Sequence, residues 1–306
     1  MLTEKRKNDL YEQGYRLVGN HSAIKVCLWT KRSLKGEGHC YKQKFYDTIS
    51  HRCVQMTPAL ELCTHRCVWC WRDTKFTRSK YNQIDDPKFI VDEAIKQNVK
   101  YLYGFGGNKR TDLSKYKEIG NPQQFAISLT GEPTLYPKLP ELILELRKRG
   151  IKQFLVTNGT NPSMLKKLLD RKAQPTQLYI TLPAPDEEVY VKCCKPTIKN
   201  GWKKINESLN LLKKFKRNVI RLTLVKDFNM IKPERYALLI KKYKPQYVEV
   251  KAYMWVGYSK KRLNIENMPL HAEIKEFAKK VAKFSAYKVA DEKKESRVVL
   301  LVSASK

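Results

Sequence analysis

The 306-residue sequence has no uncharged apolar segment close to the roughly 18–20 residues that a helix needs to cross a bilayer. Its first residues, MLTEKRKND, contain no apolar core of the kind found in a signal peptide. These absences argue against a membrane partner and predict a cytoplasmic protein. In that reducing compartment the eight cysteines are poor candidates for disulfides, and six of them lie between Cys27 and Cys70, which predicts metal binding or catalysis.

Acidic residues are also scarce: 30 Asp and Glu stand against 61 Lys and Arg, which gives a formal net charge of +31. Because 42% of the residues are hydrophobic, the chain can still bury a core, and disorder is not expected. One interpretation of the charge is a merely solvated surface. The 17 Tyr and 5 Trp favour instead an RNA partner, whose phosphates bind cations and whose bases stack on rings.

Short β-rich runs alternate with amphipathic segments along most of the chain, which is typical of βα units that build a parallel sheet. The predicted strands cover residues 53–62, 125–129, 153–156, 178–181, 219–225 and 247–251. The predicted helices include residues 89–102, 139–146, 202–212 and 272–284. About six such units are fewer than the eight of a closed barrel. The sequence therefore predicts an α/β fold, a partial (βα)6 TIM-like barrel whose working face is formed by the loops after the strands.

Three parts are expected along the chain: an N-terminal cysteine-bearing cap at residues 1–52, the partial barrel at 53–285 and a C-terminal hairpin extension at 286–306. The cap shows little periodicity, whereas residues 287–302 read as two strands around a DEKKES turn. We expect the protein to be a monomer.

The motif CTHRCVWC places Cys63, Cys67 and Cys70 on one loop, with no fourth cysteine nearby in the same run. Three thiolates can hold an iron–sulfur cluster that keeps one iron open, whereas structural zinc sites are closed by four ligands. The alternative is a zinc ion with His65 or a distant cysteine as the fourth ligand. The position directly after a predicted strand, where barrels place their chemistry, favours the cluster.

This CxxxCxxC spacing, with the aromatic residue Trp69 before the last cysteine, resembles the radical S-adenosylmethionine (SAM) superfamily. The resemblance implies that Cys63, Cys67 and Cys70 bind a 4Fe-4S cluster, that the open iron chelates SAM, and that the reduced cluster cleaves SAM to an adenosyl radical. It also implies that Trp69 lies near the adenine. A plain core aromatic is the alternative for this residue.

A second motif, SLTGEP at residues 128–133, resembles the GGEP-like segment of the same superfamily, with Thr130 in place of the first glycine. There, Gly131 would allow close backbone approach and Glu132 would accept a hydrogen bond from the SAM ammonium group. Asn158 and Thr181 follow later strands, at positions where related enzymes place polar contacts to SAM. Both are also ordinary turn or strand-end residues.

Three further cysteines, Cys27, Cys40 and Cys53, are separated by twelve residues each time. This spacing matches no compact zinc ribbon, but a folded cap could bring the three thiolates together around a second cluster. Three buried free cysteines are the alternative. Cys193 and Cys194 are adjacent in the sequence, and we interpret them as small buried thiols.

Together with the segments ISLTGEPTLYP and VEVKAYMWVGYSKKRL, the two cysteine triads resemble the family of archaeal tRNA 4-demethylwyosine synthases over nearly the whole chain. The resemblance implies a radical-SAM lyase with SAM and two 4Fe-4S clusters. Its implied reaction condenses pyruvate with 1-methylguanosine, next to the anticodon of tRNA-Phe, with loss of the carboxyl carbon of pyruvate. Eukaryotic members carry a flavodoxin-like domain upstream, so a separate electron donor protein is expected here.

Pyruvate could be activated by the second cluster or by a lysine that forms a Schiff base. Lys42, two residues after Cys40, is the candidate, and Lys44 is a weaker one. The alternative for both is a solvated side chain or a phosphate contact.

Contacts to the RNA are expected from an aromatic and basic run after the last predicted strand. Its members are Tyr253, Trp255, Tyr258, Ser259, Lys260 and Arg262. The alternative is that these rings pack the strand end. Lys75, Arg78 and Arg110 are further candidates on charge alone. The rival functions are a radical-SAM enzyme acting on another RNA base and a zinc-stabilised RNA-binding protein without catalysis.

Overall fold

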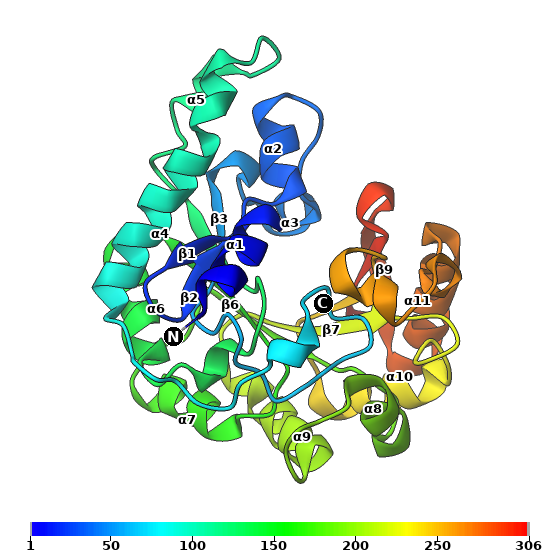
Figure 1. Cartoon of the computed structure of the whole chain (residues 1–306). Helices are drawn as coiled ribbons and strands as arrows, with labels where there is room; N and C mark the ends of the chain where they lie inside the picture. The colour runs from blue at the N-terminus through cyan, green and yellow to red at the C-terminus, as the bar shows by residue number, and fades with distance from the viewer. Residues whose placement is uncertain (1, 305–306) are drawn as a thin grey trace. The chain divides into compact units, whose positions relative to one another are not determined.

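The computed structural model describes residues 2–304, and Figure 1 traces the chain from its N-terminus to its C-terminus. The chain divides into two compact units. The first contains the chain up to Leu62, Arg78–Val156 and Asp170–Thr176, and the second contains Cys63–Thr77, Thr157–Leu169 and the chain from Gln177 onward. Among the described residues, no helix combines the length and the apolar character that crossing a membrane requires.

A five-stranded arrangement lies at the centre of the first unit. Its strands, in spatial order, are β1 (Arg16–Val18), β2 (Ser22–Ile24), β3 (Cys53–Thr57), β4 (Gln124–Ile127) and β5 (Lys152–Thr157). β3, β4 and β5 run parallel, whereas β1 and β2 pair antiparallel with their neighbours. β3 is shorter than the predicted strand because Pro58, which has no N–H to donate, follows Thr57 directly.

The α-helices in the described part of the first unit are α1 (Glu4–Glu12), α2 (Leu28–Leu34), α3 (Tyr41–Tyr46), α4 (Pro87–Leu102), α5 (Leu113–Tyr116) and α6 (Leu139–Lys148). α4 packs against α6 and against β1, β2 and β3 (Figure 1). The predicted face of α6 is confirmed, since Leu139, Leu142, Ile143 and Leu146 are all buried. Gly150 follows with a φ of +69°, the left-handed conformation that commonly ends a helix.

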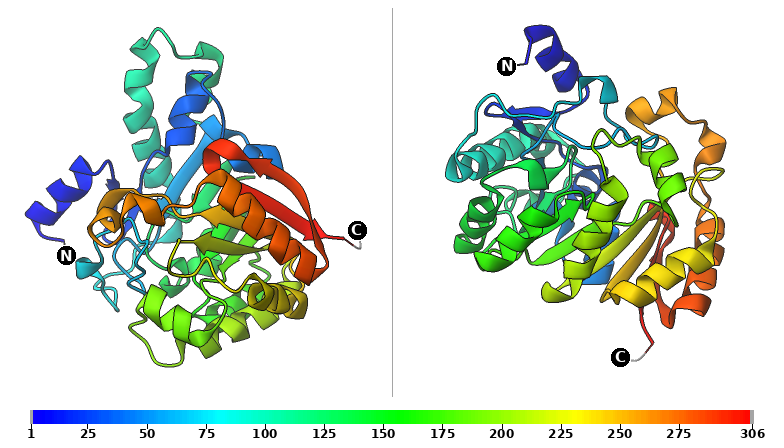
Figure 2. Two further views of the ribbon diagram at one scale, coloured as in Figure 1. Left: turned by 90° about the vertical axis from the view of Figure 1, so that its right-hand side faces the viewer. Right: turned by 90° about the horizontal axis from the view of Figure 1, so that it is seen from below.

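The second unit contains three more parallel strands, β6 (Gln177–Thr181), β7 (Asn218–Leu224) and β8 (Tyr247–Ala252). β10 (Val298–Ser303) pairs antiparallel with β8, and β9 (Tyr287–Lys293) pairs with β10. The predicted C-terminal hairpin is present, but its turn is shorter than the predicted DEKKES segment, because residues 291–293 still belong to β9. Its helices are α7 (Pro162–Asp170), α8 (Glu187–Cys194), α9 (Gly201–Leu211), α10 (Pro233–Tyr243) and α11 (His271–Ser285). Figure 2 shows the hairpin beside α11, which packs on α10, β8, β9 and β10.

The N-terminal segment has more regular structure than its weak periodicity indicates. It forms β1, β2 and three helices, and β2 pairs with β3 through Ala23–Thr57 and Ile24–Met56. Residues before 53 thus share a sheet with the first predicted barrel strand. The division at residues 52 and 285 stays a prediction.

Candidate active site

The loop that carries Cys63, Cys67 and Cys70 is held by the C-terminal turn of α8. Asp186 caps the start of this helix by accepting from the Val189 N–H, and Lys195, with a φ of +43°, ends it. The last carbonyl groups of the helix, which have no partner within the helix, accept hydrogen bonds from the cysteine loop. Arg66 N donates to Cys194 O and Val68 N donates to Cys193 O, both at 2.9 Å. The two adjacent cysteines therefore brace the cysteine loop through their backbone.

A second brace comes from the segment after β8. The Arg262 guanidinium donates from Nε to the Val68 carbonyl at 3.1 Å and from Nη2 to the Cys70 carbonyl. Tyr258 N donates to Trp71 O at 2.9 Å. A charged donor that binds two carbonyls of one loop fixes the loop strongly. Arg262 was predicted to contact RNA, but its guanidinium is engaged with this loop.

The electrostatics of the loop fit an anionic, sulfur-ligated group. A hydrogen bond with Cys194, followed by burial, raises the pKa of the Cys67 thiol well above its usual range, and burial raises the pKa of Cys70. The positive charge of Arg72 opposes both shifts. Arg72 is only 4% exposed, and its Nε and Nη1 lack hydrogen-bond partners among residues 2–304. Three thiols on one loop, two of them with raised pKa values, beside a buried cation with unused donors, suit an iron–sulfur cluster with three cysteine ligands.

The zinc alternative has partial geometric support. One ligand atom each of His65, Cys67 and Cys194 lie within 4.8 Å of one another, as ligands of a single ion do. His65 also hydrogen bonds through Nε2 to the Tyr190 hydroxyl at 2.8 Å. Such a site would leave Cys63 and Cys70 unused.

Other predicted SAM contacts in the second unit have local structural partners. Asn158 donates from Nδ2 to Thr64 Oγ1 at 2.9 Å and lies 3.9 Å from Cys63 Sγ. Trp69 packs on the cluster of Val68, Val225, Tyr253 and Leu263, as the core interpretation expects. Thr181 is the last residue of β6.

The SLTGEP turn lies against the end of β3 in the first unit. Gly131 has a φ of +70°, and a Cβ there would overlap the Ala59 carbonyl oxygen, so only glycine fits. Glu132 N donates to Leu62 O at 2.7 Å, and Thr57 Oγ1 donates to Thr130 O at 2.6 Å. The Glu132 carboxylate accepts from the Thr134 N–H and hydroxyl. The close backbone approach predicted at Gly131 is thus present.

The first unit brings the other three cysteines together. Cys27 precedes α2, Cys40 precedes α3 and Cys53 begins β3, so three separate elements supply the sulfurs. All three line one cavity of about 30 Å³ with Lys42, and Gln124, Ala126 and Phe154 complete much of its wall. Burial and then the nearby Cys27 raise the pKa of Cys53 to about 12, while Lys42 opposes this shift. A nearby cation or a metal would favour the thiolate form of Cys53.

The predicted RNA-contacting run divides into buried and accessible residues. Tyr253 and Ser259 are 2% and 0% exposed, and the Tyr253 hydroxyl donates to Ser259 Oγ at 2.7 Å. Their burial argues against base stacking by Tyr253 or direct contact by Ser259. Lys260 Nζ lies 4.4 Å from the Trp255 ring centroid, and Tyr258 remains half-buried.

Sequence reasoning missed the roles of Arg72 and Cys194, and the contact of Arg262 with the cysteine loop. A lone arginine in a chain with 61 basic residues carries no signal of burial. The pair Cys193–Cys194 was the available signal, because adjacent buried thiols in a protein with six clustered cysteines invite a role at the same site.

Comparison with known proteins agrees with this geometry. Residues 58–240 match the radical SAM superfamily, and residues 242–303 match the wyosine base formation family. The S-adenosyl-L-methionine-dependent tRNA 4-demethylwyosine synthase of Pyrococcus abyssi is 48% identical over 98% of this chain and 89% of its own length.

Two solved structures are similar along the whole chain. A structure of TYW1 with a lysine–pyruvate adduct bound has a TM-score of 0.91 and 35% identity, covering 100% of this chain and 98% of that one. A crystal structure of archaeal TYW1 has a TM-score of 0.82 and 32% identity at the same coverage. The predicted fold class, a partial barrel of the radical-SAM type, is confirmed by these matches.

Proposed function

The chain belongs to the family of S-adenosyl-L-methionine-dependent tRNA 4-demethylwyosine synthases, and from that membership we propose that it condenses pyruvate with 1-methylguanosine of tRNA-Phe. It is a radical-SAM enzyme of tRNA wyosine synthesis. The zinc-stabilised binding protein without catalysis is not favoured. The proposal adds three points: that pyruvate is the second substrate, that it loses its carboxyl carbon in a lyase-type reaction, and which residues bind the cofactors and substrates.

Cys63, Cys67 and Cys70 would hold the 4Fe-4S cluster that, with SAM, supplies a radical able to take a hydrogen atom from the N-methyl group of the guanine. The protein itself holds the cysteine loop in place and sets the charge around it. The α8 turn and Arg262 fix the cysteine loop, and Arg72 places positive charge beside the sulfurs. Trp69, Thr130, Gly131, Glu132, Asn158 and Thr181 stay predicted contacts to SAM.

The observation that carries the pyruvate assignment is the cavity shared by Lys42 and the three cap cysteines. In its unprotonated form the Lys42 amine can attack the keto carbon of pyruvate, and loss of water gives an imine. The imine holds the carbon that receives the methyl-derived carbon of the guanine. A TYW1 of known structure carries a lysine–pyruvate adduct, which supports the same chemistry here.

Cys27, Cys40 and Cys53 would hold a second 4Fe-4S cluster beside this lysine. The donor set supports the assignment, since three thiols line one cavity and the pKa of Cys53 is raised by burial and by Cys27. Lys42 would then lie where it can offer bound pyruvate to a neighbouring metal.

Tyr258 and Lys260 remain the proposed contacts to the RNA near the end of β8, because both keep accessible surface. The net charge of +31 supplies the long-range attraction to phosphate.

Anaerobic turnover tests the function. Reconstituted protein is incubated with SAM, a reductant and tRNA-Phe that carries 1-methylguanosine, with and without pyruvate, and the nucleosides are identified by mass spectrometry. The proposal predicts the tricyclic base only when pyruvate is present. A modified base that forms equally without pyruvate would point to the rival radical-SAM reaction on RNA.

A further inference from the structure

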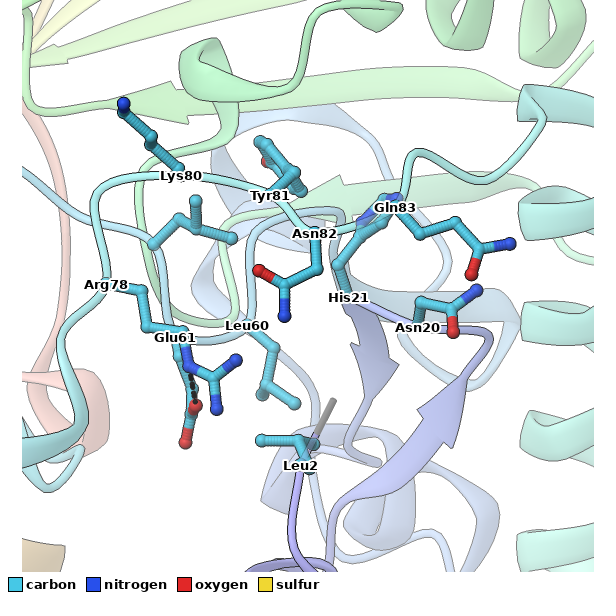
Figure 3. Close-up of a pocket in the computed structure, with 11 residues that line it drawn as sticks. Leu2, Asn20, His21, Leu60, Glu61, Arg78, Lys80, Tyr81, Asn82 and Gln83 are labelled. Carbon is cyan, nitrogen blue, oxygen red and sulfur yellow. Dashed lines mark ion pairs between the residues drawn. The ribbon is translucent and has the colours of Figure 1, made fainter.

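A second cavity of the first unit has no role in the chemistry described above. It has a volume of about 300 Å³ and shares no residue with the cavity at Lys42. Leu2, Leu60 and Leu62 contribute apolar wall, while Arg78, Lys80 and Asn82 contribute polar groups (Figure 3). The wall reaches Glu61 and Leu62, which directly precede the cysteine loop in the sequence.

The cationic part of this wall is fixed in place. Arg78 N donates to the Glu61 carbonyl at 2.8 Å, and Arg78 Nε lies 3.2 Å from Glu61 Oε2 (Figure 3). Glu61 is 4% exposed, and its Oε1 accepts from Arg6 Nε at 2.8 Å. The Arg78 side chain itself stays 41% exposed. A guanidinium held this way loses little further freedom when it binds an anion.

The neighbouring wall is fixed by a neutral histidine. His21 Nδ1 donates to Pro58 O at 2.7 Å, and its Nε2 accepts from Asp85 N at 3.0 Å. The Tyr81 ring lies edge-on to His21, with centroids 4.7 Å apart, and its hydroxyl donates to Pro58 O. The loop that carries Lys80 and Asn82 is therefore anchored at Tyr81.

Two polar side chains of the cavity make no contact that stabilises the described part of the fold. Lys80 and Asn82 are exposed, and within the described part of the chain neither makes a hydrogen bond or an ion pair. Figure 3 shows the Asn82 amide directed toward the middle of the cavity and Lys80 at its edge. An amide offers both a donor and an acceptor, as the edge of a nucleobase requires.

We propose that this cavity binds one nucleotide of the RNA substrate, adjacent to the nucleotide that is modified. The base would lie on Leu60 and Leu62 with its edge on Asn82, and the phosphate would bind Arg78 and Lys80. An apolar floor, an amide and two cations suit a ribonucleotide, and the strong positive charge of the chain suits a polyanion. The inference rests on the proposed function, since it takes tRNA as the substrate.

Binding of a fluorescent anticodon stem-loop RNA that carries 1-methylguanosine tests the site. Lys80→Ala should weaken binding about three- to tenfold and lower the salt dependence of log Kd by about one unit of slope. Asn82→Ala should weaken binding to a similar degree without changing that slope. Lys241→Ala is the matched control, because Lys241 lines a separate cavity near Tyr287 in the second unit. This control should bind like the wild type.

The outcomes separate this inference from the proposed function. If the wild type binds and turns over the RNA while Lys80→Ala and Asn82→Ala bind within about twofold of it, the nucleotide site is wrong and the function stands. If the wild type neither binds nor modifies the RNA, both are wrong. A loss in the Lys241→Ala control as large as in Lys80→Ala would also overturn the site, because charge alone would then explain the effect.

A different observation concerns Cys194. This residue is fully buried, and its Sγ lies within 4.8 Å of Cys67 Sγ. Its backbone oxygen also binds the loop at Arg66 N. When Cys67 ligates iron, the Cys194 side chain lies close enough to the ligand sulfur for its S–H group to donate a hydrogen bond to it. Hydrogen bonds to cluster sulfurs are one of the factors that set reduction potential.

We infer that Cys194 is a positioning residue that raises the reduction potential of the cluster held by Cys63, Cys67 and Cys70. A donor to a ligand sulfur stabilises the added negative charge of the reduced state, so removal of the donor makes reduction harder. Cys193 is the natural control, because it is equally buried on the same turn but does not belong to the close group formed by His65, Cys67 and Cys194.

An electron paramagnetic resonance titration of the reconstituted full-length protein measures this potential. Cys194→Ala should shift the potential to a more negative value, Cys194→Ser should restore most of it through its hydroxyl donor, and Cys193→Ala should leave it unchanged. An unchanged potential in Cys194→Ala overturns the inference. So does loss of the cluster in both Cys194 variants, since the residue would then only pack the loop.

Discussion

Lys42 Nζ lies 5.0 Å from the centroid of the Phe154 ring, in the cavity that Cys27, Cys40 and Cys53 also line. The ring limits water on one side of the amine, and the three sulfurs line the same cavity. Replacing Lys42 by Ala or Arg should lower formation of the tricyclic base by about two orders of magnitude or more, because no imine can form. Cleavage of SAM should continue in both variants.

Borohydride reduction followed by peptide mass spectrometry checks this assignment directly. Wild-type protein incubated with pyruvate should carry a reduced adduct on the peptide that contains Lys42. Lys44→Ala, which removes an exposed lysine of the same helix, is the control and should trap pyruvate like the wild type. Trapping on Lys44, or normal product formation by Lys42→Ala, would remove Lys42 from the mechanism.

The two cysteine triads should have separable functions. Cys67→Ala should abolish SAM cleavage but retain most RNA binding, whereas Cys40→Ala should spare SAM cleavage and block formation of the tricyclic base. Anaerobic iron analysis should give about eight irons in the wild type and about four in each variant. A wild type with about four irons, or Cys40→Ala with normal product, would contradict a second cluster at the cap cysteines.

The SLTGEP turn should tolerate no side chain at Gly131. Gly131→Ala forces a Cβ into the Ala59 carbonyl at a positive φ and should lower the free energy of unfolding by about 3 kcal/mol or more. Gly150→Ala is matched in φ, +69° against +70°, but its Cβ would meet no atom within 4 Å. This control should cost only about 1 kcal/mol of backbone strain. Urea unfolding of both variants gives the comparison, and equal losses would show that the contact with Ala59 is unimportant.

Protonation of His21 should destabilise the first unit in acid. Burial lowers the pKa of His21 below its ordinary value of 6.5. Below pH 6.5 the unfolded chain therefore binds a proton at this residue that the folded chain does not, and stability falls as the pH falls. The slope contributed by His21 is at most about 1.4 kcal/mol per pH unit, down to its folded pKa.

His21→Gln keeps a donor and an acceptor at this position but cannot be protonated. Its free energy of unfolding should therefore depend less steeply on pH below 6.5 than that of the wild type. His65, whose pKa burial lowers to about 3, contributes with the same sign and remains in the variant as an internal reference. Parallel pH profiles for the two proteins would show that His21 is accessible to protons in the fold.

The sequence predicted the parts of the fold that are determined by short stretches of chain. The buried parallel strands and the apolar face of α6 follow directly from runs and periods of hydrophobic residues. β1 and β2 were missed because three residues each are too short to show a period, and pairing with β3 stabilises them.

At the site, spacing predicted that Cys63, Cys67 and Cys70 share one loop, and the close backbone approach at Gly131 was predicted from the turn that it forms. Contacts between segments that are far apart in the sequence could not be predicted. Arg262 was expected at an RNA surface because charge beside aromatic residues favours RNA, yet its side chain binds the Val68 and Cys70 carbonyls. Tyr253 was expected there on the same pattern and is only 2% exposed, since alternation of rings describes a buried strand end equally well.

Turnover with labelled pyruvate tests the central claim most directly. Reconstituted wild-type protein is given SAM, reductant and 1-methylguanosine-containing tRNA-Phe, with pyruvate labelled with carbon-13 either at carbons 2 and 3 or at carbon 1 only. Condensation at Lys42 predicts that the tricyclic base carries both labelled carbons from the first substrate and none from the second. A tricyclic base that lacks carbons 2 and 3, or that retains carbon 1, would contradict the account.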